Sequence, residues 1–203
     1  MKNLYNKNMK LFSKTYATYL SKILSDLDHK AIDSFSKVLL KARKNNNQIF
    51  FAGNGGSAST ASHFINDLGA DVLKANGKKK ITKSFRVLSL NDNVATITAI
   101  SNDIGYDEVF SRQLEVYGKV NDILVVISAS GNSKNLIRAV LKAKKMKIIT
   151  IGLLGFDGGK LMKLVDLSVK TNTNINEFGP TEDSHLIVCH ILSNYFSQFF
   201  KSK

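Results

Sequence analysis

The sequence has little of what crosslinks a chain or interrupts its regular structure. Its 203 residues include one cysteine, Cys189, one proline, Pro180, and no tryptophan. A single cysteine excludes an internal disulfide, which is typical of proteins kept in a reducing compartment. No Pro-rich or Gly/Ser-rich stretch marks a linker between domains. We therefore expect one domain over residues 1–203.

Long hydrophobic runs are also missing. The longest apolar block near the middle of the chain is ILVVI, whereas a membrane-spanning helix needs about 20 apolar residues. The basic N-terminal segment MKNLYNKNMKLF lacks the apolar stretch of a secretory signal. Apolar residues still make up 43% of the chain, enough for a globular core. These features predict a soluble, cytoplasmic protein that does not act at a membrane.

Acidic residues are few relative to basic ones, and the formal net charge is +13. Such a charge is common in proteins that bind nucleic acid, but it also attracts anionic metabolites. The lysines are scattered, apart from the segment KANGKKKITK at residues 74–83, and no zinc-finger or RNA-recognition pattern accompanies them. We interpret that segment as a solvated loop and predict no nucleic-acid partner.

Short apolar runs alternate with segments of helical periodicity along most of the chain. Two amphipathic helices are predicted first, over residues 11–27 and 29–45. Apolar runs then predict five strands, at residues 48–53, 85–90, 122–128, 147–155 and, more weakly, 165–171. Helical patterns follow at about residues 57–68, 107–118, 135–145 and 181–200.

Apolar strands that alternate with helices are typical of a parallel sheet covered on both faces. The predicted fold class is therefore α/β, a doubly wound, flavodoxin-like five-stranded parallel sheet over residues 48–203. Residues 1–47 would form helices that either cap the sheet or bury their apolar stripes against a partner subunit.

Two loops of small residues follow the first and third predicted strands. GNGGSAS at residues 53–59 and ISASGNS at residues 127–133 each open a helix. The first N–H groups of a helix attract anions, although glycines can also serve close packing and a serine can be an ordinary helix cap. Neither loop is a P-loop or a GxGxxG motif. A phosphate held by hydroxyls and backbone, without a nucleotide motif, suggests a phosphosugar.

Four motifs carry a resemblance to a known family. GNGGSAS with SHF at residues 62–64, SNDIGYDEVFSRQLEVYG at 101–118, DILVVISASGNS at 122–133 and GFDGGKL at 155–161 resemble the sugar isomerase (SIS) domain family. The resemblance implies an aldose–ketose isomerase that converts sedoheptulose 7-phosphate to D-glycero-D-manno-heptose 7-phosphate for surface polysaccharide such as lipopolysaccharide. It also implies a homotetramer with interfacial sites and a bound zinc. We expect GFDGGKL itself to be mainly structural.

His63 and Asp67 lie four residues apart on a predicted helix and therefore share one face. That spacing suits two ligands of one metal ion, but also a simple surface pair. The resemblance implies that His63 binds zinc and that Asp67 is both catalytic base and ligand. The family usually has glutamate at this position, and aspartate is one methylene shorter.

The last predicted helix adds Glu182, Asp183, His185 and His190. The resemblance implies that His190 is catalytic and binds the metal, and it aligns Glu182 with a position that is usually glutamine. Helical periodicity would instead place Asp183 on the face of His190. Following the resemblance, we predict His63, Asp67, Glu182 and His190 as zinc ligands and Asp67, Glu182 and His190 as catalytic. His185 and Cys189 are interpreted as packed, buried side chains.

The resemblance also implies the residues that contact the substrate. They are Asn54, Gly55, Gly56, Ser57, Asn102, Asp103, Ser128, Ala129, Ser130 and Ser133. The serine loop would take the phosphate, while Asn102 and Asp103, in a loop at a strand end, would meet sugar hydroxyls. Two alternatives remain open. One is a non-catalytic SIS protein that senses phosphosugars or associates with a replication initiator, and the other is an isomerase of a different phosphosugar.

Overall fold

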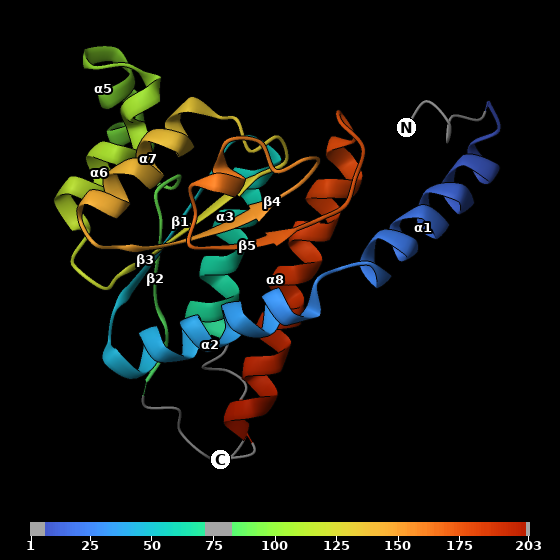
Figure 1. Ribbon diagram of the computed structural model, residues 1–203, viewed down its shortest axis with the longest axis horizontal. Coiled ribbons are helices and arrows are strands. Elements are labelled where there is room, and N and C mark those ends of the chain that lie inside the picture. The colour runs from blue at the N-terminus through green and yellow to red at the C-terminus, as the bar shows by residue number, and fades with distance from the viewer. Residues whose placement is uncertain (1–6, 72–82, 202–203) are drawn as a thin grey trace.

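A parallel sheet of five strands organises the chain (Figure 1). The structure is a computed structural model that describes residues 7–71 and 83–201. The strands are β1 (Gln48–Gly53), β2 (Arg86–Ser89), β3 (Ile123–Ser128), β4 (Ile149–Leu154) and β5 (Leu167–Lys170). Their order is β2-β1-β3-β4-β5, and every neighbouring pair is parallel. The predicted doubly wound α/β fold is confirmed.

The sheet reverses its strand order between β1 and β3. In register, Ile49 lies opposite Ile123, and Gly53 lies opposite Ile127. The chain leaves β1 toward β2 at one edge, whereas it leaves β3 toward β4 in the other direction. The two small-residue loops therefore start side by side at the switch point, where ligands bind in sheets of this kind.

Helices cover both faces of the sheet. The long helices are α1 (Met9–Ser25), α2 (His29–Asn45), α3 (Gly56–Ile65), α5 (Val94–Asp103), α6 (Val109–Tyr117), α7 (Lys134–Lys145) and α8 (Phe178–Lys201). Figure 1 shows α5, α6 and α7 on one side of the sheet, and α2, α3 and α8 on the other. Shorter segments are the π-helix η2 (Asn66–Asp71) and the 3-10 helices η3 (Tyr106–Glu108) and η4 (Leu161–Lys163).

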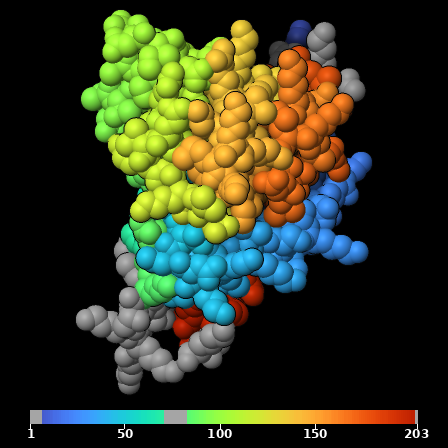
Figure 2. Space-filling model, turned by 60° about the vertical axis from the view of Figure 1, so that its left-hand side comes forward, coloured from blue at the N-terminus to red at the C-terminus, as the bar shows by residue number. Residues whose placement is uncertain are grey.

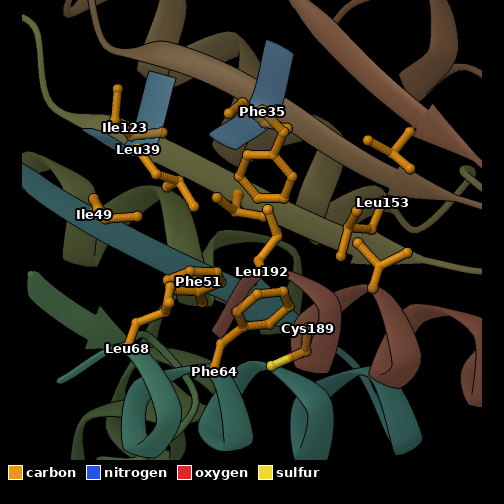
Figure 3. Close-up of a cluster of buried hydrophobic side chains, with 14 of the residues drawn as sticks. Phe35, Leu39, Ile49, Phe51, Phe64, Leu68, Ile123, Leu153, Cys189 and Leu192 are labelled. Atoms are coloured by element: carbon orange, nitrogen blue, oxygen red, sulfur yellow. The ribbon is translucent and has the colours of Figure 1, made fainter. Parts of the chain in front are cut away.

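Alternate residues of each strand enter two separate cores. Ile49 and Phe51 of β1 face a cluster completed by Phe35 and Leu39 of α2, with α3 and α8 (Figure 3). Phe50, between them, faces a second cluster with residues of α6 and α7. Because both faces are buried, β1 and β3 are apolar without interruption, which is why the sequence predicted them well.

Most of helix α1 projects away from the sheet (Figure 1), but its end reaches the first cluster, where Leu24 packs against the core and Ile23 is the one buried residue of the helix. It contacts the start of α8, where the Tyr16 hydroxyl donates to Asp183 Oδ2 at 2.5 Å and the Tyr19 hydroxyl donates to Glu177. Met9 and Leu11 are exposed. Contact of α1 with a partner subunit therefore stays a prediction, whereas α2 does cap the sheet.

Two segments differ from the sequence-based expectation, and a third lies mostly outside the described residues. The segment after β2 was expected to be a loop around Asn102 and Asp103, and this is wrong, because residues 94–103 form α5. Its β-branched residues obscured a helix that has no fully buried residue and in which Ile97 and Ile100, both partly buried, pack against the second cluster. The predicted helix over 57–68 is α-helical to Ile65 and π-helical from Asn66. Most of the basic segment 74–83 lies outside the described residues.

No helix among the described residues is both long enough and apolar enough to cross a membrane. In the space-filling view, the green-to-yellow atoms of the region of α5, α6 and α7 lie above the light-blue atoms of α2 (Figure 2).

Packing of α2 against the sheet predicts a large effect of truncating its core face. Leu39 is fully buried, whereas Leu141 on α7 is 45% exposed. We expect Leu39→Ala to lower the free energy of unfolding by about 2–5 kcal/mol and Leu141→Ala by less than about 0.5 kcal/mol. Denaturant unfolding of both variants measures this. Equal effects would show that α2 does not share the core.

Candidate functional site

A small cavity lies at the switch point between the loops that follow β1 and β3. Its volume is about 130 Å³. It is lined by Asn54, Ser57, Ile127, Ser128, Ala129, Ser130, Ser133, Phe178 and Glu182. Six of the ten predicted substrate-binding residues are among them, and Gly55 and Gly56 lie in the same loop as Asn54.

Three helices begin at this cavity. Helix α3 starts at Gly56 beside Asn54 and Ser57, α7 starts after Ser133, and α8 starts at Phe178. Each helix N-terminus presents unbonded N–H groups and the positive end of a helix dipole. Such a convergence is suited to an anion, and no lysine or arginine lines the cavity.

The serine hydroxyls of the second loop differ in their hydrogen bonds. Ser128 Oγ accepts a hydrogen bond from the Gly131 N–H at 3.0 Å and so shapes the loop. Ser130 Oγ accepts one from Asn132 N–H at 3.3 Å. Ser133 occupies the N-cap of α7 but makes no capping hydrogen bond with its side chain. Its hydroxyl therefore lines the cavity in a position to meet a ligand.

The Gly-rich segment at residues 155–161 supports the serine loop. Gly131 has a φ of +63°, and a Cβ there would overlap the carbonyl of Gly158. The Leu161 N–H donates to the Gly131 carbonyl at 3.0 Å. This close interlocking favours the structural interpretation of GFDGGKL, since the segment packs beneath the loop and does not line the cavity.

A side-chain network that the sequence did not reveal holds Asn54. Asn54 and Asn135 exchange two amide hydrogen bonds, of 3.0 and 2.9 Å, and the Tyr106 hydroxyl donates to Asn54 Oδ1 at 2.9 Å. Asn135 comes from α7 and Tyr106 from η3, far away in sequence. No local pattern marks such partners. Asn54 thus ties the first loop to the second.

Asn102 and Asp103 do not line the cavity. They end α5, and the Asn102 amide donates to Asp103 Oδ1 at 2.8 Å. Because both side chains are exposed, their contact with a sugar stays a prediction.

Glu182 of α8 lines the cavity where α8 begins to contact α3. It lies so close to Gly56, the first residue of α3, that a Cβ on Gly56 would collide with its carboxylate. Burial raises the pKa of the Glu182 carboxyl, and the nearby Asp183 raises it further. Asp183 itself accepts a hydrogen bond from Tyr16 of α1. This favours Glu182 over Asp183 as the acid at the cavity.

His63 and His190 meet two turns further along the same helices. Their Nε2 atoms are 2.9 Å apart, and His63 Nε2 lies 3.4 Å from Asp67 Oδ1. Glu182 beside Gly56, His190 beside His63 and Ser193 beside Asp67 show that α8 runs parallel to α3. About 1.5 Å per residue places the histidines roughly 10 Å from the start of α3.

This histidine–carboxylate group suits a metal ion in its donor chemistry. Neighbouring ligands of a tetrahedral zinc with Zn–N near 2.05 Å lie about 3.3 Å apart, close to the separations seen here. His63, Asp67 and Cys189 also offer ligand atoms within 4.8 Å of one another. Of the four predicted ligands, His63 contacts both Asp67 and His190, but the described group whose ligand atoms all lie within 4.8 Å of one another holds Cys189 in place of His190. The carboxylate of Glu182 lies instead against Gly56, so its place in the same ligand set stays a prediction.

His185 and Cys189 are buried in the same helix. Neither ring nitrogen of His185 has a hydrogen-bond partner among the described residues. Burial lowers the pKa of His185 to about 4, with a smaller opposing effect of the Leu154 backbone. Burial likewise raises the pKa of the Cys189 thiol. Both residues are packed as the sequence suggested, although the Cys189 sulfur lies 4.0 Å from Asp67 Oδ2.

A larger groove of about 330 Å³ lies between α6 and α7. Its charges pair with one another, as Arg138 does with Glu108 and Lys142 with Glu115. Size alone therefore does not identify the site.

Comparison with known proteins gives a consistent result. The family profile described as "SIS domain" matches residues 12–155. A protein of Helicobacter pylori named phosphoheptose isomerase is 37% identical over 91% of both chains. The solved phosphoheptose isomerase of Francisella tularensis has a TM-score of 0.81 at 26% identity, covering 96% of this chain and 100% of that one. The corresponding structure from Neisseria gonorrhoeae has a TM-score of 0.76 at 29% identity, covering 92% and 93%.

The buried His185 predicts a pH dependence of stability. Its pKa is about 4 in the folded chain and about 6.5 when unfolded, so the unfolded state binds the proton first. Stability is fully present above pH 6.5 and is lost as the pH falls toward 4, by on the order of 3 kcal/mol from this group. His185→Met should flatten the unfolding free energy over that range. An unchanged slope would show that His185 is hydrated or paired.

Proposed function

Because the chain belongs to the SIS domain family, we propose that it is an aldose–ketose isomerase that converts sedoheptulose 7-phosphate to D-glycero-D-manno-heptose 7-phosphate. The relatives named phosphoheptose isomerase support this assignment. The observation that carries it is the two-part site along α3 and α8. An anion cavity lies at one end, and a histidine–carboxylate group lies about two turns away.

The separation of the two parts suits a long substrate. The phosphate and the reacting carbons lie at opposite ends of a seven-carbon sugar phosphate. Six carbon–carbon bonds of about 1.5 Å in a zigzag, with the phosphoester, span a length similar to the roughly 10 Å between the start of α3 and His63. With its phosphate in the serine cavity, such a sugar would bring C1 and C2 toward His63, Asp67 and His190.

Isomerisation moves a proton between C2 and C1 through an enediol, and this requires groups that accept and return it. In this proposal, Asp67 and His190 would lie at the reacting end. Glu182 lines the phosphate cavity beside Gly56, and its raised pKa favours a carboxyl that can hold a proton nearer neutral pH. We assign these three residues the catalytic roles, with the oxygens of the sugar chain lying along α3.

We assign zinc as the cofactor, held by His63, Asp67 and His190. Glu182, which the sequence also predicts as a ligand, lies against Gly56 roughly 10 Å away, so it does not fit the same ligand set and keeps only its acid–base role. When bound, zinc supplies Lewis-acid polarisation of the sugar oxygens. The mixed histidine and carboxylate donors are compatible with zinc or a related divalent ion.

The remaining parts of the proposal concern assembly and setting. The exposed apolar residues of α1 support a homo-oligomer, and we propose a tetramer. We place the protein in the cytoplasm, with a small phosphosugar as its partner and no nucleic acid. Its product would feed heptose for lipopolysaccharide.

The catalytic assignment predicts loss of turnover with retained folding. We expect His190→Ala and Glu182→Gln each to lower kcat by about 10²-fold or more, the range for loss of a general acid or base. Conversion of sedoheptulose 7-phosphate, followed by chromatography with and without zinc and a chelator, measures this. His29→Ala and Glu115→Gln, exposed residues outside the site, are matched controls. Binding of the sugar without turnover in the parent protein would instead indicate a sensor or another substrate.

If the cavity binds the phosphate, substitutions at two helix N-cap residues should have opposite effects, one on sugar-phosphate binding and the other on stability. Ser133 makes no capping bond, whereas the Asn93 side chain caps α5 by accepting from the Thr96 N–H at 3.0 Å. Ser133→Ala should weaken sugar-phosphate binding about 10–100-fold, the value of one hydrogen bond to a charged group, with stability unchanged. Asn93→Ala should cost about 0.5–2 kcal/mol of stability with binding unchanged. Calorimetric titration and thermal unfolding separate the two, and the reverse pattern would contradict the assignment.

A further inference from the structure

The carboxylate of Asp67 is held from both sides. Asp67 is 8% exposed. Its Oδ1 lies 3.4 Å from His63 Nε2 and 3.3 Å from the Asn66 amide, while its Oδ2 accepts a hydrogen bond from Ser193 Oγ at 3.0 Å. The bond from Ser193 is the shortest of these contacts. It comes from α8, across the helix interface.

Ser193 has one hydroxyl proton and two acceptors within reach. The alternative is the backbone carbonyl of His190, one turn earlier on its own helix, at 3.3 Å. Hydrogen bonds to an ionised carboxylate are shorter and roughly twice as strong as those to a neutral oxygen. The Ser193 hydroxyl therefore donates its hydrogen bond to Asp67 Oδ2 in preference to the His190 carbonyl, in agreement with the shorter distance, 3.0 Å against 3.3 Å.

Asp67 needs such an anchor because its own backbone does not lie in a regular α-helix. The chain is α-helical to Ile65 and π-helical over Asn66–Asp71. Single π-turns are frequent at functional sites, where they change the direction of a side chain. A short aspartate at the start of such a turn can rotate about χ2, which would exchange the oxygen that faces His63.

We infer that Ser193 is a positioning residue that fixes the Asp67 carboxylate by binding Oδ2, so that Oδ1 faces His63. This inference rests on the proposed metal-binding role of His63 and Asp67. Partners behind a ligating carboxylate typically contribute 10–100-fold to metal affinity. Sequence alone gives no reason to single out Ser193, which lies three residues beyond His190.

The test is metal affinity of the full-length protein, measured for zinc by competition with a chromophoric chelator and for Co²⁺ by its visible absorption. Ser193→Ala should weaken zinc binding about 10–100-fold and alter the cobalt spectrum, and Ser193→Thr should restore both. Ser184→Ala is the matched control. Ser184 is a buried serine of the same helix whose hydroxyl donates to the Pro180 carbonyl at 2.6 Å.

The outcomes separate the inference from the function on which it rests. Zinc affinity and cobalt spectrum unchanged in Ser193→Ala, with normal affinity in the parent protein, would overturn the role of Ser193 and leave the isomerase assignment intact. An equal loss in Ser184→Ala would also overturn it, because the effect would then be that of any buried hydroxyl in α8. A parent protein that converts the sugar but binds neither metal would overturn the inference together with the proposed zinc, and not the isomerase.

Discussion

The parallel packing of α3 on α8 is the constraint from which the site follows. Gly56 lies beside Glu182, His63 beside His190 and Asp67 beside Ser193, so equivalent turns of the two helices face each other. Both helices begin at the carboxyl edge of the sheet, and both dipoles therefore point their positive ends at the same cavity. An antiparallel pair would place His190 near the cavity and separate it from His63. The parallel packing of these two helices thus brings together a cavity suited to an anion and, two turns away, a histidine–carboxylate group suited to proton transfer.

Most of the sheet could be predicted because its strands are buried on both faces and read as unbroken apolar runs. Helix α5 could not, since none of its residues is fully buried and its contact with the second cluster rests on the partly buried Ile97 and Ile100. The loops were found because glycine and serine clusters carry local information about backbone and caps. Asn135, Tyr106 and Ser193 were missed, since each matters through a partner more than 50 residues away in the chain and no local pattern encodes such a contact.

The candidate metal ligands also show which contacts the sequence could predict: those between residues close in the chain, but not those between different helices. The spacing of His63 and Asp67 predicted a shared face, and their 3.4 Å separation confirms it. Resemblance, not periodicity, selected Glu182 over Asp183, and in the structure Asp183 accepts a hydrogen bond from Tyr16 of α1. A residue in the second turn of α8 can bond to α1. Helical periodicity predicts which residues share a face but not which element that face contacts. Near its start, α8 contacts both α3, through Glu182, and α1, through Asp183.

The net charge of +13 and the composition of the cavity have separate consequences for binding. No lysine or arginine lines the cavity, so a phosphate there would be held by hydroxyls, backbone N–H groups and helix dipoles. Because these hydroxyls and N–H groups are held in fixed positions, they would bind only a ligand whose shape fits the cavity. The dispersed lysines act at longer range, where they raise the local concentration of anions and accelerate encounter. Salt should therefore slow association more than it weakens the bound complex, because surface charges are screened within about 10 Å and the contacts inside the cavity are not. Attraction of anions by the dispersed lysines and recognition of a phosphate by the cavity would thus depend on different parts of the molecule.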